Sequence, residues 1–140
     1  MADGVMELQK AIVTKLRAST ALVAIVGTNG IFDRNEGKRV FPSVVLGEAQ
    51  VINEDETIGV PGSYLYSRVY NDLHLWSRDV GLGECKAMAA AVRRALHGTV
   101  TINGYLDVLH FEAARFMRDP QGEAGHGVVT VWTRIWESLS

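Results

Sequence analysis

The sequence predicts an α+β fold: a largely antiparallel sheet with two helices packed on one face, in the chain order α-β-β-α-β-β. Three observations lead to this prediction. Apolar residues recur at every third or fourth position in two segments, they recur at every second position in four others, and turn-forming residues separate these segments. With 140 residues the chain is long enough for one core, so we expect residues 1–140 to form a single domain.

The composition is that of a globular protein, because 47% of the residues are hydrophobic, 21% are charged and only 3 are Pro. It excludes disordered, collagen-like and coiled-coil chains. Lys and Arg number 14 and Asp and Glu 16, and the resulting net charge of −2 has the wrong sign for binding nucleic acid by bulk charge. The one cysteine, Cys85, excludes an internal disulfide. No apolar run approaches the ~20 residues that span a bilayer, so we expect a soluble protein made in the cytoplasm.

The first element is a helix near the N-terminus. Its apolar positions are Val5, Leu8, Ile12 and Leu16. They are spaced by three or four residues with charged residues between them, which predicts an amphipathic helix. Ser19 and Thr20 predict the cap of a further short helical turn, which ends at the glycines within residues 27–30.

Two strands follow this helical part. Ser43–Ile52 is predicted as a strand that begins just after Pro42, and Asn53–Ser63 as a loop with an acidic cluster and a Gly-Val-Pro-Gly breaker. Tyr64–Trp76 is predicted as a long strand, because its residue types alternate between two faces. One face carries Leu65, Val69, Leu73 and Leu75, and the other carries Tyr66, Arg68, Tyr70, Asp72, His74 and Trp76.

A second helix is predicted over Glu84–His97, with Gly98 as its stop signal. Five of its residues are alanines, at positions 87, 89, 90, 91 and 95, and these small side chains would let the helix lie close to a sheet. Arg93 and Arg94 stand near its C-terminal end, where cations interact favourably with the helix dipole. Cys85 falls on the apolar stripe, which favours a buried small side chain over a reactive thiol.

The last two strands are predicted to form an antiparallel hairpin. They are Leu106–Met117 and Val128–Trp136, and the sequence Asp-Pro-Gln-Gly at residues 119–122 between them is a strong turn signal. A minor strand near Val100–Ile102 precedes the hairpin.

The two helices cover only one face of such a sheet, so the other face must meet solvent or another molecule. Tyr, Arg, His and Trp side chains gather on that face, a mixture typical of protein interfaces. We therefore expect a subunit interface formed by Tyr66, Arg68, Tyr70, His74, Trp76, Trp132, Arg134 and Trp136. The alternative is a partly solvated face of amphipathic side chains.

The acidic cluster of Glu54, Asp55 and Glu56 lies in the predicted loop. Ordering a long loop with two glycines costs conformational entropy, which contacts with a partner would offset, so we expect a partner-binding loop. The alternative is a solvated hairpin tip. The cluster lacks the ligand spacing of a calcium loop.

No sequence pattern predicts catalysis. The four histidines lack the spacing that places two metal ligands on one helix, and no Gly-x-Ser-x-Gly nucleophile motif occurs. Gly81-Leu82-Gly83 precedes a helix, but Lys86 stands where the dinucleotide fingerprint requires its third glycine. We therefore expect no catalytic residue, no metal, no cofactor and no enzyme activity.

Five segments, taken in order with their intervening lengths, resemble the tail terminator (tail completion) proteins of long-tailed bacteriophages and gene transfer agents. They are Phe41–Glu48, Leu73–Arg78, Glu84–His97, Arg118–Gly122 and His126–Val128. The resemblance extends from about Glu7 to Glu137. The sequence departs from the family where a Pro often follows the first Ile-Phe-Asp segment, because Asn35-Glu36-Gly37 occupies that turn here.

The resemblance implies an α+β subunit that assembles into a ring, commonly a hexamer, at the head-proximal end of the tail. Such a ring caps the tail tube, stops its polymerisation and joins the tail to the head. Its partners would be the tube protein and a head-completion or connector protein, with DNA passing through the lumen without specific binding. We expect a virion protein assembled in the host cytoplasm and no membrane association.

Two alternatives remain from the sequence. The chain could be another neck or tail component, either a head-tail connector or the tube subunit itself. It could also be a small enzyme of unknown substrate, for which a cluster of polar residues in a deep pocket would be the distinguishing feature.

Overall fold

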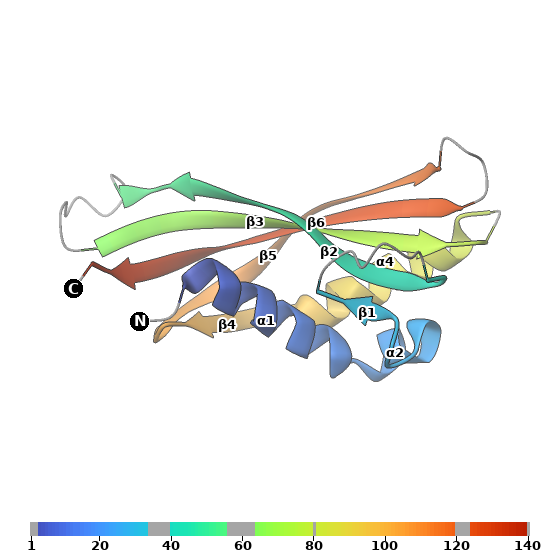
Figure 1. The fold of residues 1–140 in the computed structure, drawn as a ribbon, viewed down its shortest axis with the longest axis horizontal. Coiled ribbons are helices and arrows are strands. Elements are labelled where there is room, and N and C mark those ends of the chain that lie inside the picture. The colour runs from blue at the N-terminus through green and yellow to red at the C-terminus, as the bar shows by residue number, and fades with distance from the viewer. Residues whose placement is uncertain (1–2, 34–39, 56–63, 80, 120–123, 140) are drawn as a thin grey trace.

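The computed structural model describes residues 3–33, 40–55, 64–79, 81–119 and 124–139, and all element counts refer to these residues (Figure 1). The helices are α1 (Gly4–Arg17), α2 (Thr20–Val26) and α4 (Gly83–Leu96). The strands are β1 (Ile31–Phe32), β2 (Ser43–Asn53), β3 (Tyr64–Ser77), β4 (Gly98–Ile102), β5 (Tyr105–Arg118) and β6 (Gly125–Ser138). They form one curled six-stranded sheet in the order β1-β2-β3-β6-β5-β4.

The predicted α+β fold is confirmed. All strand pairs are antiparallel except the short parallel pair of β1 with β2, and the helices lie together against one face of the sheet (Figure 1). The structure adds β1 to the predicted order, and the short turn expected after residue 19 is the helix α2. Two residues of β1 are too few to show an alternating pattern, which explains why the sequence did not reveal them.

The helix boundaries follow from local capping. The Asp3 side chain accepts hydrogen bonds from the backbone N–H groups of Val5 and Met6 and so begins α1. The Ser19 hydroxyl accepts from the N–H of Leu22 and begins α2, and Gly27, with φ +78°, ends it. Polar residues before each apolar run therefore determine where both helices start.

The start of α4 has a different cap. Leu82, at the N-cap position, adopts a left-handed backbone and makes no side-chain cap bond. Asp79, which precedes the helix, provides the missing cap, because its carboxylate accepts a hydrogen bond from the backbone N–H of Glu84 at 2.9 Å. Ser77, the last residue of β3, donates to the Glu84 carboxylate at 2.6 Å. The glycine-rich turn before α4 therefore joins the end of β3 to the helix.

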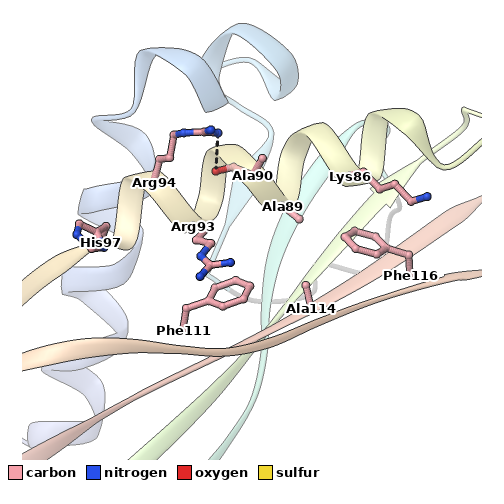
Figure 2. A pocket seen from close by; sticks show the side chains of 9 residues that line it. All are labelled: Lys86, Ala89, Ala90, Arg93, Arg94, His97, Phe111, Ala114 and Phe116. Carbon is pink, nitrogen blue, oxygen red and sulfur yellow. Dashed lines mark hydrogen bonds between the residues drawn. The ribbon is translucent and has the colours of Figure 1, made fainter.

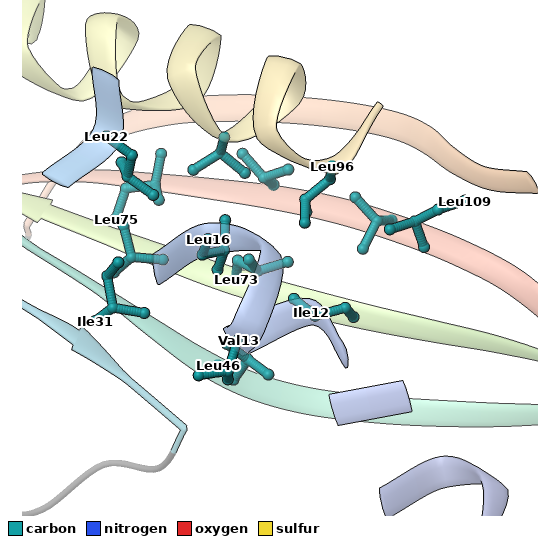
Figure 3. Packing of buried hydrophobic residues seen from close by; sticks show 14 of the residues in the cluster. Ile12, Val13, Leu16, Leu22, Ile31, Leu46, Leu73, Leu75, Leu96 and Leu109 are labelled. Atoms are coloured by element: carbon teal, nitrogen blue, oxygen red, sulfur yellow. The ribbon is translucent and has the colours of Figure 1, made fainter. Parts of the chain in front are cut away.

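One apolar core lies between the helices and the sheet (Figure 3). The helices contribute fully buried side chains such as Leu8, Ile12 and Leu16 from α1 and Met88 and Val92 from α4. The sheet contributes Val69, Leu73 and Leu75 from β3 and Val129, Val131 and Ile135 from β6. The helices thus bury the predicted apolar face of β3 along most of its length.

Leu65 is an exception to that prediction, because 42% of its surface is exposed. It pairs with Glu137 near the end of β6, beyond the part of the sheet that the core covers. Alternation along a strand identifies a face, but only the length of the covering helices determines how far along the strand that face is buried.

Within the residues described above, the helices are too short or too polar to cross a bilayer.

Cys85 is fully buried, and its thiol lies 3.8 Å from the carbonyl oxygen of Leu75. Burial, together with the nearby carboxylates of Glu84 and Asp79, raises the pKa of the Cys85 thiol to about 11. The predicted buried, unreactive cysteine is consistent with this environment.

We expect the stability of the protein to fall between pH 9.0 and about 11, because the folded chain retains the Cys85 proton while the unfolded chain loses it. Urea unfolding measured across this range should show a free energy of unfolding that decreases with pH. The decrease should be smaller in Cys85→Ala, in which the Cys85 thiol is absent and Tyr66, whose pKa is raised to about 12, still contributes to the pH dependence. An identical slope in the variant would contradict the assignment.

Candidate functional site

The face of the sheet turned away from the helices, here called the outer face, carries the residues predicted from the sequence. All eight lie on β3 and β6, whose antiparallel ladder is continuous over the length of both strands. The register places Tyr66 opposite Trp136, and Tyr70 opposite Trp132. Facing side chains on one side of a sheet lie close enough to interact, so the register determines which residues meet.

An aromatic cluster occupies one end of the outer face. The ring centroid of Trp136 lies 4.8 Å from that of Tyr64, 5.7 Å from that of Tyr66 and 5.8 Å from that of Tyr105. The hydroxyls of Tyr66 and Tyr105 are hydrogen-bonded at 3.2 Å. Only 7% of Tyr66 is exposed. Burial is the main cause that raises the pKa of Tyr66 to about 12, and the hydrogen bond with Tyr105 is the second. Tyr66 therefore remains neutral and anchors the cluster within the subunit.

Trp132 is the centre of a second cluster. His110 stacks on its ring with centroids 4.0 Å apart, and Arg68 and Arg134 lie 4.7 and 5.0 Å from its centroid. Its indole N–H donates to the Glu112 carboxylate at 2.8 Å. Stacking, cation–π contacts and a charged hydrogen bond together hold this ring in one orientation.

Glu54 neutralises a pair of arginines within the same region. Arg68 and Arg134 face each other across the ladder, an arrangement of like charges that is destabilising by itself. The Glu54 carboxylate forms ion pairs with both guanidinium groups, and its side chain is only 10% exposed. Glu54 therefore binds the outer face of its own subunit, where it compensates the charge of both arginines.

The acidic segment that contains Glu54 was predicted as a partner-binding loop. Asp55 also contacts its own sheet, since its carboxylate accepts from the backbone N–H of Tyr66 at 2.6 Å. Glu56 lies outside the described residues. The contacts of Glu54 and Asp55 hold the beginning of this segment against β3, and a partner-binding role for the cluster remains a prediction.

A histidine cluster occupies the other end of the outer face. His74 and His126 are hydrogen-bonded through ring nitrogens at 2.9 Å, and Trp76 stacks on His126 with centroids 3.9 Å apart. The other ring nitrogen of His74 lies 3.1 Å from the Glu48 carboxylate. Gly47 permits this approach, because a Cβ there would overlap the His74 ring. The pKa of Glu48 is lowered by two main causes: the larger is a backbone hydrogen bond at Glu48, and the next is the hydrogen bond with His74.

Sequence reasoning missed several side chains of the outer face. They are Tyr64, Tyr105, His110, Glu112 and His126, all of which contact predicted members. His126 lies two residues before the predicted last strand, so extending that strand would have placed it opposite Trp76. The contacts of Tyr105 and Glu112 carry no sequence signal, because β5 bends at an irregularity between Phe111 and Ala113.

The arrangement is suited to binding rather than to acid–base chemistry. Its central arginines, Arg68 and Arg134, are paired with Glu54, and its rings form a row of partly exposed aromatic surface. Across the described ranges, no group of three or more His, Cys, Asp or Glu side chains is placed to hold a metal ion. Aromatic rings held by their neighbours lose little entropy when a partner covers them, which is favourable at an interface.

We expect Glu54→Gln to lower the free energy of unfolding by about 1–3 kcal/mol, because it leaves Arg68 and Arg134 facing each other without compensation. Glu7→Gln is a matched control, since it removes only an exposed ion pair with Lys10 and should cost less than about 0.5 kcal/mol. Adding Arg134→Gln to Glu54→Gln should cost less than the sum of the single changes. Additive losses in urea unfolding would show that the three side chains are not coupled.

Comparisons with known proteins agree with this geometry. Residues 10–136 match the profile of a family described as tail completion protein gp17. A chain in the solved structure of the virion of a native gene transfer agent particle has a similar fold, with a TM-score of 0.80 and 25% sequence identity. The similarity covers 96% of this chain and 99% of that one. A search of curated proteins found no match.

Proposed function

Because this chain belongs to the tail completion protein family, and is thus a structural virion protein and not an enzyme, we propose that it forms a hexameric ring at the head-proximal end of a tail tube. The ring stops polymerisation of the tube and joins the tail to the head. The similarity to a virion chain over almost the full length of both molecules supports this proposal.

The outer face is the observation on which the proposed ring contact rests. It combines three tryptophans with arginine, histidine and tyrosine, the residue types that contribute most to binding at protein interfaces. A ring needs a contact between two different patches of neighbouring subunits that closes after a fixed number of copies. The outer face supplies one of these patches.

The same proposal defines the remaining partners. One rim of the ring binds the tail tube protein, and the other binds a head-completion or connector protein, with the acidic segment 54–56 as one contact. DNA passes through the lumen without specific binding, which agrees with the formal net charge of −2. Growth stops because the ring binds the tube end but offers no equivalent surface for the next tube subunit.

We expect Trp76→Ala combined with Trp132→Ala to weaken ring formation while the subunit remains folded. An aromatic anchor at an interface contributes about 2 kcal/mol or more, so half-assembly should require a protein concentration at least about tenfold higher. Light scattering and electron microscopy measure assembly, and slow reaction of Cys85 with a thiol reagent reports an intact fold. Leu106→Ala, which truncates an exposed residue outside the three clusters of the outer face, is the control. Unchanged rings in the double variant would overturn the proposed interface.

Removal of the protein from its particle system tests the terminator role. We expect heads that contain DNA but lack tails, together with free tails of abnormal length, and joining should return when the protein is added to the separate halves. Tails of normal length attached to heads would overturn the proposal. Detached tails of normal length would instead indicate a connector, and long tubes of the purified protein would indicate a tube subunit.

A further inference from the structure

A second surface lies on the opposite side of the sheet from the outer face. Between α4 and β5 runs a groove with a volume of about 570 Å³ (Figure 2). Its apolar floor is formed by Phe111, Ala114 and Phe116 of β5. Its wall is α4, which turns Lys86 and Arg93 toward these rings.

The groove carries a concentration of positive charge. Lys86, Arg93, Arg94 and His97 all border it and all are exposed. Arg93 and His97 follow Lys86 by seven and eleven residues, which places the three along one face of the helix. Among the described side chains, no carboxylate forms an ion pair with Lys86, Arg93 or Arg94. The Arg93 guanidinium lies over the Phe111 ring, 4.5 Å from its centroid.

The groove follows an open strand edge. β4 pairs with β5 only from Tyr105 to Leu109, whereas β6 pairs with the remainder of β5 on its other side. Within the described part of the chain, residues 110–118 thus have a strand on one side only. Nine residues of strand are about 30 Å long. Their outward N–H and C=O groups can receive another strand.

A second hollow, of about 230 Å³, continues the groove toward β4. It shares Arg93, His97 and Phe111 with the first and adds Val108 and Leu109. The apolar floor, the cationic wall and the open edge therefore run in parallel. An extended peptide presents backbone bonds and alternating side chains along the same line.

We propose that the α4–β5 groove binds an extended segment of another protein that presents acidic and apolar side chains in turn on one face of the strand. The segment adds to β5 as a strand, and on its helix-facing side the apolar side chains lie on Phe111 and Phe116 while the carboxylates pair with Lys86 and Arg93. Nucleic acid fits less well, because phosphates would use the cations but leave the phenylalanine floor and the strand edge unused. The groove is built by α4 and β5, whereas the residues of the proposed ring contact lie on β3 and β6, and His110 borders both the second hollow and Trp132.

The probe for this site is an acetylated, amidated peptide of two Glu-Ser-Val-Ser repeats, labelled for fluorescence anisotropy, in which Glu and Val share one face of a strand. We expect saturable binding that weakens with added salt, and no binding of the matching Lys-Ser-Val-Ser peptide. Hydrogen exchange should show new protection of the β5 amides between residues 110 and 118. Binding of both peptides alike, or binding without protection of β5, would overturn the proposal.

Charge reversal provides the site-specific test. Arg93→Glu, and separately Lys86→Glu, should weaken binding of the Glu-Ser-Val-Ser peptide by about tenfold or more. Arg115→Glu is the matched control, since this exposed arginine lies on β5 opposite Val128, on the outer face, and binding should be unchanged. Full binding in both groove variants would overturn the proposal. Slow Cys85 modification checks that each variant is folded.

Two further outcomes would assign the groove to a different occupant. Tighter binding of a short duplex DNA than of the peptide, with the same loss in Arg93→Glu, would assign it to nucleic acid. Loss of ring formation in Arg93→Glu without added peptide would assign it to a second copy of this chain. Rings that form normally in a variant unable to bind the peptide would support two separate surfaces.

Discussion

The antiparallel pairing of β3 with β6 determines the positions of almost all the side chains discussed above. The two strands pair from Tyr64 opposite Ser138 to Ser77 opposite Gly125 without a break in register. Side chains alternate along a strand, so a shift of one residue would move the apolar set to the solvent side and the aromatic set into the core. The core and the outer face are thus two results of one register.

The outer face shows how a polar, aromatic surface can remain ordered without covering helices. Its rings stack on one another, and its charges are compensated within the subunit, as Glu54 does for Arg68 and Arg134. This internal pairing gives the face a fixed shape before any partner arrives, which reduces the entropy lost on binding. The proposed ring contact would benefit from such preorganisation, because every subunit of a ring has to present the same geometry.

The α4–β5 groove differs from the outer face in the pairing of its charges and of its backbone. Its cations have no carboxylate partners among the described residues, and its strand edge is open. The sheet therefore has one face whose central arginines are paired internally and, beneath one edge of the other face, a groove whose cations are not paired with carboxylates of the described residues. Such a division would allow a small subunit to contact copies of itself and a different protein at the same time, through separate chemistry.

The sequence by itself determined the fold class, the main helices, the four long strands and the set of aromatic and basic residues on one face of β3 and β6, because apolar periodicity and alternation are local properties of the chain. It also indicated the buried state of Cys85. Only the tertiary structure decided that Leu65 is exposed, that Glu54 turns back onto two arginines, and that Phe111 and Phe116 meet the cations of α4. These outcomes depend on where helices end over the sheet and where β5 bends away from β6, and such long-range geometry leaves no periodic signal in the sequence.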